Sequence, residues 1–260
     1  MNMRTGFTEG EICWTDLQTS DVPAAKEFYA AVFGWRFEDL PTPDGRSYAR
    51  AFLGEDLVSV IAPQNPHQLA AGATPQWNVY FASPDAGELA AGLVHAGGTL
   101  EFGPEAVGGT GVMVFFSPPG GGTTGAWQAG THLGTARGGE PGALTWAELL
   151  TPEPQSAVGF FQQLFGHDVT EYPQDDGGKY STLMVNGTEV AGIAAVPADA
   201  EGTLRPGWQV YFGVSSVAEA VAAAEAAGGT VLIAPDEADE AGTIATLEDP
   251  QGGVFSVLEV

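Results

Sequence analysis

An internal repeat constrains the fold of this 260-residue chain more than any other feature of its sequence. The stretch ICWTDLQTSDVPAAKEFYAAVFGW (Ile12 to Trp35) recurs 132 positions later as LTWAELLTPEPQSAVGFFQQLFGH (Leu144 to His167). Further along each half, WNVYF matches WQVYF, and SPPGGG matches DPQGG, in the same order. The repeat therefore predicts two copies of one unit, and the chain is long enough to give each copy its own core.

Each copy itself alternates between strand and helix patterns. Glu11 to Thr19 alternates like a strand, Ser20 or Asp21 can cap a helix that ends at Gly34, and three short strands are expected after it. A strand near residues 76–83 and a helix near 85–96 then restart the pattern. We predict an α+β fold of four βαβββ units, divided into a domain at 1–133, a linker at 134–143 and a domain at 144–260.

The net charge of the chain limits the classes of molecule that it can bind. There are 33 acidic residues against 8 basic ones, for a net charge of −25, so a nucleic-acid backbone would be repelled. The N-terminal residues lack the apolar core of a secretion signal, no stretch approaches a membrane span, and Cys13 is the single cysteine. We therefore expect a cytoplasmic protein that binds neither nucleic acid nor membrane.

Several motifs resemble those of the vicinal oxygen chelate superfamily, which includes glyoxalase I, extradiol dioxygenases and bleomycin-resistance proteins. They are AAKEFYAAVFGW after Asp21, WNVYF, AGG and the closing DPQGGVFSV. The resemblance covers the whole chain and is closest to a tandem two-domain actinobacterial branch. It implies that each domain folds into a mixed sheet shaped like a cup, with a site on its inner face.

Metal-dependent members of that superfamily hold a divalent cation in each cup with two His and one Glu. Carried over residue by residue, those positions fall on Trp14, Asn78 and Thr124 in the first half and on Trp146, Gln209 and Ser256 in the second. None of these side chains is a usual metal ligand. We predict that neither cup holds a metal or another cofactor, and that the histidines, His67, His95, His132 and His167, lie at the surface.

The cups should instead share a set of aromatic and polar side chains. Strand alternation places Trp14 and Asp16 on one face, as it does the later pair Trp146 and Glu148. The same rule pairs Asn78 with Tyr80 and Gln209 with Tyr211, while Trp77 and Trp208, one residue out of phase, are expected to pack in the core. Further candidates to line the cups are Tyr48, Tyr180, Trp127 and Phe52.

Two functions fit this set. A binding protein would stack a small aromatic or hydrophobic molecule on the indoles, whereas a metal-independent enzyme would use Asp16 or Glu148 for proton transfer on an aromatic or polyketide-like substrate. The acids could also serve only as acceptors for neighbouring donors. A metal-dependent dioxygenase or lyase fits the sequence less well. Either a monomer or a homodimer is compatible with two domains in one chain.

Overall fold

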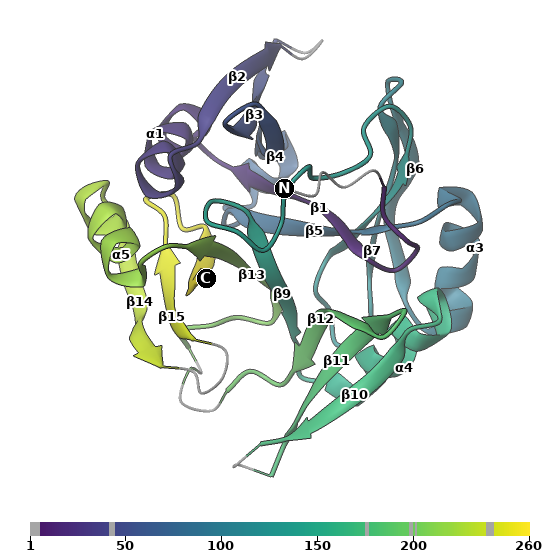
Figure 1. The fold of residues 1–260 in the computed structure, drawn as a ribbon. Coiled ribbons are helices and arrows are strands. Elements are labelled where there is room, and N and C mark those ends of the chain that lie inside the picture. The colour runs from purple at the N-terminus through teal and green to yellow at the C-terminus, as the bar shows by residue number, and fades with distance from the viewer. Residues whose placement is uncertain (1–5, 42–44, 175–176, 198–199, 201, 238–241) are drawn as a thin grey trace.

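The computed structural model describes residues 6–41, 45–174, 177–197, 200, 202–237 and 242–260, and it contains two eight-stranded mixed sheets (Figure 1). The first sheet has the strand order β2-β3-β4-β1-β5-β8-β7-β6. Its elements are β1 (Ile12–Thr19), α1 (Val22–Phe33), β2 (Arg36–Pro41), β3 (Ser47–Leu53), β4 (Asp56–Pro63), α2 (Pro66–Ala70), β5 (Gln76–Ala82), α3 (Ala86–Ala96), β6 (Thr99–Val107), β7 (Gly111–Ser117) and β8 (Thr124–Ala129).

The second sheet repeats this order as β10-β11-β12-β9-β13-β16-β15-β14. Its elements are β9 (Leu144–Leu150), α4 (Pro154–Phe165), β10 (Asp168–Pro173), β11 (Lys179–Val185), β12 (Thr188–Ala194), β13 (Gly207–Val214), α5 (Val217–Ala226), β14 (Thr230–Glu237), β15 (Thr243–Glu248) and β16 (Val254–Glu259). The predicted α+β fold of two tandem domains and four βαβββ units is confirmed. The short helix α2, which Asn65 caps inside a Pro-rich connection, was not predicted.

The helix boundaries follow from local chemistry. Asp21 accepts a hydrogen bond from the Ala24 amide at 3.0 Å, which satisfies one of the free N–H groups at the start of α1. At the other end Gly34 has a φ of 69°, a left-handed conformation that glycine adopts without strain. Gly166 ends α4 in the same way, with a φ of 71°.

The pairing of β1 with β5 aligns the predicted site residues. These antiparallel strands place Trp14 opposite Tyr80 and Asp16 opposite Asn78. In the second half, β9 and β13 place Trp146 opposite Tyr211 and Glu148 opposite Gln209. Directly opposed residues share a face of the sheet, so each half gathers an indole, a carboxyl, an amide and a phenol on one surface.

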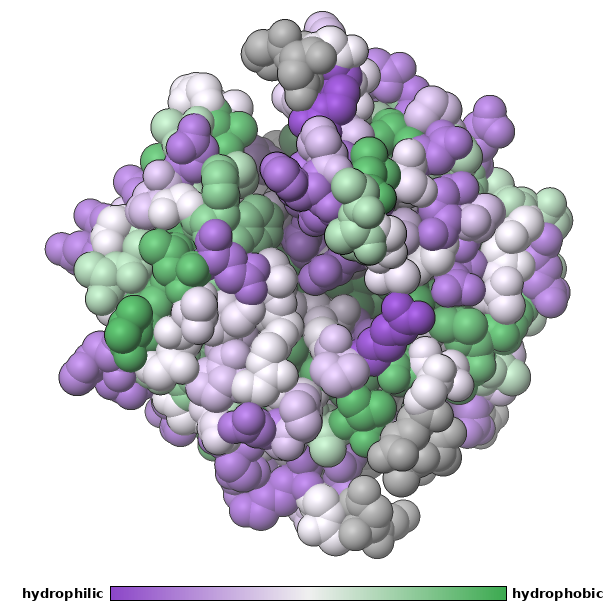
Figure 2. All heavy atoms as spheres, turned by 180° about the vertical axis from the view of Figure 1, so that it is seen from behind, coloured by the Kyte–Doolittle hydropathy of each residue, from purple (hydrophilic) through white to green (hydrophobic). Residues whose placement is uncertain are grey.

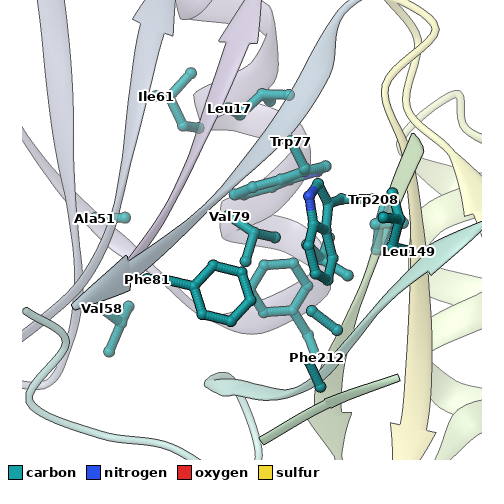
Figure 3. Close-up of a cluster of buried hydrophobic side chains, with 14 of the residues drawn as sticks. Leu17, Ala51, Val58, Ile61, Trp77, Val79, Phe81, Leu149, Trp208 and Phe212 are labelled. Carbon is teal, nitrogen blue, oxygen red and sulfur yellow. The ribbon is translucent and has the colours of Figure 1, made fainter. Parts of the chain in front are cut away.

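The opposite faces of the two sheets pack into a single core that joins the halves. Trp77, Phe81, Trp208 and Phe212 lie together between β5 and β13 (Figure 3). Helix α1 packs on α5, and α3 packs on α4, so the two long helices of the first half each contact a helix of the second (Figure 1). The prediction that Trp77 and Trp208 are packing residues is confirmed, since only 2% and 5% of their surfaces are exposed.

Buried hydrogen bonds also cross between the halves. Tyr29 of α1 donates to Asp249 Oδ2 at 2.9 Å and accepts from Trp77 Nε1 at 3.2 Å. His167 lies within hydrogen-bond distance of two carbonyl oxygens, with its Nε2 at 2.8 Å from that of Gly10 and its Nδ1 at 3.2 Å from that of Phe161. The prediction that His167 lies at the surface was wrong, because this residue follows α4 at the point where the second half covers the first.

The segment between the domains packs against both of them. Arg137 forms a 2.6 Å ion pair with Asp56 of β4, and Trp35 Nε1 donates to the Gly142 carbonyl at 2.8 Å. Pro141 forms an isolated bridge with Gly213 of β13. The domains therefore meet through an ordered connection. Within the described residues, no helix is long and apolar enough to cross a membrane.

Replacing Tyr29 with Phe should destabilise the protein by about 1–2 kcal/mol, because the buried Asp249 carboxyl loses a donor. Urea unfolding would measure the change. Tyr172→Phe is the matched control, since the Tyr172 hydroxyl also donates to a carboxylate, that of Glu189. Tyr172 is half-exposed, so water can replace the hydrogen bond that this substitution removes. Equal effects of the two substitutions would contradict a structural role for the Tyr29 hydrogen bond.

Candidate ligand-binding cups

The first cup is the face of the first sheet that carries Trp14, Asp16, Asn78 and Tyr80. Asp16 is its hydrogen-bonded centre: Asn78 Nδ2 donates to Oδ1 at 2.7 Å and the Tyr80 hydroxyl donates to Oδ2 at 2.6 Å. Burial raises the pKa of Asp16 to about 6, although both hydrogen bonds oppose the shift by favouring the charged form. The carboxyl is thus fixed in position and can change protonation near neutral pH.

Aromatic and apolar side chains surround this carboxyl. Trp14, Tyr80 and Trp127 pack together with partly buried residues from the neighbouring strands, which include Leu57, Val60, Met113 and Phe115. The ring centres of Tyr80 and Phe115 are 5.3 Å apart. Trp127, a candidate lining residue, is buried in this cluster.

Positive charge borders the first cup on the side of β3. Arg50 is directly opposite Val60, which is in turn opposite Asp16, so Arg50 shares the cup face. Its guanidinium lies 5.4 Å from the centre of the Phe52 ring and forms a 2.7 Å ion pair with Glu38. Phe52, expected as a lining residue, is therefore a platform for arginine at the edge of the cup.

His132 belongs to the first cup, which contradicts the prediction that it lies at the surface. Its ring centre is 4.4 Å from that of Trp14 in an edge-on arrangement, and Trp127 Nε1 donates to its carbonyl at 2.9 Å. Burial lowers the pKa of the imidazole, so it is neutral at pH 7. No sequence spacing could have indicated this, because the chain turns back over the cup only after β8 ends.

Cys13 also lies in the first-cup cluster, although regular strand alternation would place it on the face opposite Trp14. The pairing of β1 with β5 shifts by one residue between Ile12 and Trp14, and Cys13 occupies this bulge. Its thiol donates to the Tyr80 carbonyl at 3.4 Å. A cavity of about 260 Å³ lies beside it, lined by Phe7, Cys13 and Trp127 among others.

The second cup, the matching face of the second sheet, holds its carboxyl differently. The Tyr211 hydroxyl donates to Glu148 Oε1 at 2.5 Å, and Tyr180 is a second hydrogen-bond partner of Glu148. Trp146 Nε1 donates to the Tyr180 hydroxyl at 2.9 Å. Burial raises the pKa of Glu148 and of both phenols, and the carboxylate adds to the shift of the phenols.

One residue on the strand beside the acid explains this difference between the cups. Gly192 lies opposite Glu148, and a Cβ added there would collide with the Tyr180 hydroxyl. Val60 occupies the corresponding place opposite Asp16. Tyr48, predicted to act like Tyr180, lies on the same face of β3 as Arg50, but its hydroxyl makes no hydrogen bond within the described residues.

Thr124 does not belong to the first cup, so its assignment to the family's third metal-ligand position was wrong. Tyr80 pairs with Gly125, whereas its counterpart Tyr211 pairs with Ser256. The turn of the first half contains one more residue than that of the second, so the expected register was off by one. Thr124 faces the shared core and accepts from Trp208 Nε1 at 2.9 Å.

Gly125 and Ser256 occupy equivalent positions in the two halves, and they give the two cups different linings. A Cβ at Gly125 would overlap the Tyr80 ring, so the phenol packs directly on the backbone of β8. Ser256 instead exchanges a 3.0 Å hydrogen bond with Thr246 of β15. The first cup is consequently aromatic on this side, whereas the second cup presents hydroxyl groups.

The side chains at the family's metal positions do not fit a divalent cation. In the first cup they are Trp14, Asn78 and Gly125, in the second Trp146, Gln209 and Ser256, and neither set offers an imidazole or a carboxylate. The nearby acids, Asp16 and Glu148, already accept protein donors. Across the described part of the chain, no cluster of three His, Cys, Asp or Glu side chains is arranged to hold a metal.

The surface is hollowed near the centre of the face seen in Figure 2. Hydrophilic side chains gather around this hollow, whereas apolar residues are more scattered over the rest of that face. Small molecules have a concave surface to enter there, as ligand sites in proteins usually provide.

Comparisons with known proteins agree with the fold and with the pairing of the two cups. Residues 11–123 match the model of the Glyoxalase/Bleomycin resistance protein/Dioxygenase superfamily, and residues 146–258 match that of a glyoxalase-like domain. The chain belongs to this superfamily, whose members share the vicinal oxygen chelate fold.

Two relatives extend over nearly the whole chain. CFP32 of Mycobacterium tuberculosis, whose name as a glyoxylase is provisional, is 36% identical and the match covers 100% of this chain and 98% of CFP32. The anthracycline biosynthesis protein DnrV of Streptomyces peucetius is 32% identical over 98% of this chain and 95% of DnrV. Both relatives therefore share the tandem arrangement.

Solved structures support the fold alone. A Mn(II)-bound glyoxalase from Novosphingobium aromaticivorans superposes with a TM-score of 0.67 at 19% identity, covering 96% of this chain and 82% of its own. The 2,3-dioxygenase LapB from Pseudomonas sp. KL28 gives 0.67 at 16% identity, covering 97% and 93%. At these identities the superpositions say nothing about whether this chain binds a metal.

The pKa of Asp16 should appear in the pH dependence of stability. Because that pKa is about 6 in the folded protein and about 4 in an unfolded chain, the folded protein holds the extra proton between these pH values. The free energy of unfolding should therefore fall by roughly 2 kcal/mol as the pH rises from about 4 to 6, and Asp16→Asn should abolish this part of the change. Urea unfolding of both proteins across this range would test it. Parallel curves would show that Asp16 has an ordinary pKa.

Proposed function

We propose that the first cup binds a planar aromatic small molecule without a metal ion. The observation that carries this proposal is the position of the Asp16 carboxyl, which Asn78 and Tyr80 hold on the same face of the sheet as the aromatic cluster of Trp14, Tyr80 and Trp127. Flat apolar walls bury the faces of an aromatic ring, while a few fixed polar groups orient its substituents. The cup supplies both kinds of contact.

The raised pKa of Asp16 suits ligands that carry phenol or ketone oxygens. A protonated carboxyl donates a hydrogen bond to a ketone, whereas the carboxylate accepts one from a phenol. With a pKa of about 6, both forms are accessible near neutral pH. The net charge of −25 further favours neutral or cationic ligands over anions.

The relatives support a natural-product ligand. DauV of Streptomyces sp. strain C5 and DnrV are both anthracycline biosynthesis proteins, each 32% identical to this chain. Anthracyclines are fused-ring polyketides with phenol and ketone groups, which is the ligand class that the first cup would accept. We therefore propose an aromatic polyketide-like ligand, with binding for carriage, sequestration or resistance.

A second candidate function is enzymatic, and the hydrogen bond between Tyr80 and Asp16 favours it. A carboxyl whose pKa lies near neutral can remove or return a proton, and a phenol 2.6 Å away can stabilise the charge that remains on it. Such an enzyme would isomerise or otherwise transfer protons within an aromatic polyketide. It would need no metal, because the carboxyl acts as the base.

Removal of the first-cup indole should weaken aromatic binding much more than removal of its counterpart in the second cup. With 1,4-dihydroxyanthraquinone as the probe, Trp14→Leu should lose about tenfold or more in affinity, because ring contact and apolar burial are lost. Trp146→Leu should stay within about twofold of the original protein. Absorbance titrations would give both affinities, and thermal melts would verify folding. Equal losses in the two variants would exclude the first cup as the preferred site.

Asp16→Asn distinguishes the binding protein from the enzyme. Asparagine keeps the size of the side chain and can still accept from Tyr80, so a binding protein should keep its affinity for the dihydroxyanthraquinone probe within about fivefold. An enzyme should lose turnover by a factor on the order of a hundred or more. Mass spectrometry of a panel of aromatic polyketides incubated with each protein would follow turnover. Equal conversion by both proteins would exclude Asp16 as the catalytic base.

A further inference from the structure

Gln209 in the second cup has a buried side-chain oxygen that lacks a hydrogen-bond partner among the described residues. Only 7% of the residue's surface is exposed, and the oxygen without a partner is Oε1. Its counterpart Asn78 donates to Asp16 in the first cup. In the second cup the hydrogen-bond partners of Glu148 are instead two tyrosines, Tyr211 and Tyr180.

Gln209 also lines a cavity between the two halves. This cavity has a volume of about 550 Å³, and its lining combines the starts of β5 and β13 with the turn before β16. Trp77 and Trp208 lie along it, and its polar lining includes Gln76, Arg205, Gln209 and Glu248. The volume is in the usual range for a small-molecule site.

The charges around the cavity restrict the class of ligand. Arg205 makes no ion pair or hydrogen bond within the part of the chain that the structure describes, and Glu248 adds one carboxylate to the same wall. An anion would satisfy Arg205 but not Glu248 or Gln209 Oε1, and a cation would fail at Arg205. A hydroxyl group both donates and accepts, so several hydroxyls on one neutral molecule match every polar group of this lining.

We propose that the cavity between the halves, next to Gln209, binds a neutral polyhydroxylated molecule of the monosaccharide class. This site is separate from the aromatic site in the first cup and does not depend on it. The duplication would thus have produced two different binding sites. The first cup would bind an aromatic molecule through its rings and one carboxyl, and the cavity next to Gln209 would bind hydroxyl groups through hydrogen bonds.

Gln209→Met separates a ligand contact from a structural role. Methionine has nearly the same volume but no amide, so a binding role predicts weaker binding with an unchanged or higher melting temperature. The matched control is Gln162→Met, on the exposed face of α4. A clear drop in the melting temperature of Gln209→Met relative to this control would show that the amide stabilises the fold, and would overturn the proposal.

Saturation-transfer NMR with glucose, galactose and rhamnose as probes tests the ligand class directly. At least one should bind, with the affinity reduced about tenfold in Gln209→Met and unchanged in Gln162→Met. Saturating dihydroxyanthraquinone should not displace the sugar, because the two proposed sites are separate. Loss of sugar binding would therefore leave the aromatic site in the first cup untouched, and the reverse also holds. Glucuronate and glucosamine serve as charged analogues. Binding of a charged analogue alone, or of none of the five sugars, would overturn the proposal.

Discussion

The antiparallel pairing of the two central strands in each half is the constraint on which the rest of the structure depends. It opposes Trp14 to Tyr80 and Asp16 to Asn78, and the pleat then sends Trp77 to the other face. One face of the pair is therefore a polar and aromatic cup, and the other is the core that joins the halves. A shift of one residue in this pairing would exchange the two faces and destroy both.

The same pairing in the second half shows how a duplicated cup diverges through small residues. Gly192 in place of Val60 lets Tyr180 reach the acid, and Ser256 in place of Gly125 replaces a surface for ring packing with a hydroxyl. These exchanges leave the strand order unchanged. They change which side chains donate to the carboxyl, and in the same cup Gln209 Oε1 is buried without a partner among the described residues. The proposed divergence of function follows from this redistribution of donors.

The fold could be predicted from the sequence because three signals agreed. These were the internal repeat, the alternation of strand and helix periodicity, and the capping residues at the helix ends. The face of each central site residue was also predictable, since strand alternation from Trp14 and Trp146 needs no tertiary information. Thr124 was misplaced because one additional residue in a Gly-rich turn shifts the register of β8 without any sign in the pattern. His132 and His167 were missed because contacts between distant segments decide where loops and helix ends lie.

The replacement of the family's usual metal ligands gives the two acids a different role. Each carboxyl accepts hydrogen bonds from protein side chains, and burial raises its pKa, whereas a bound cation would favour the charged form. The central claim is that Asp16 and Glu148 are acceptors for protein hydrogen bonds and not metal ligands. Anomalous diffraction from crystals soaked in Mn²⁺ would test it most directly. We predict no anomalous peak in either cup, and a Mn²⁺ ion coordinated by Asp16 or Glu148 would contradict the claim.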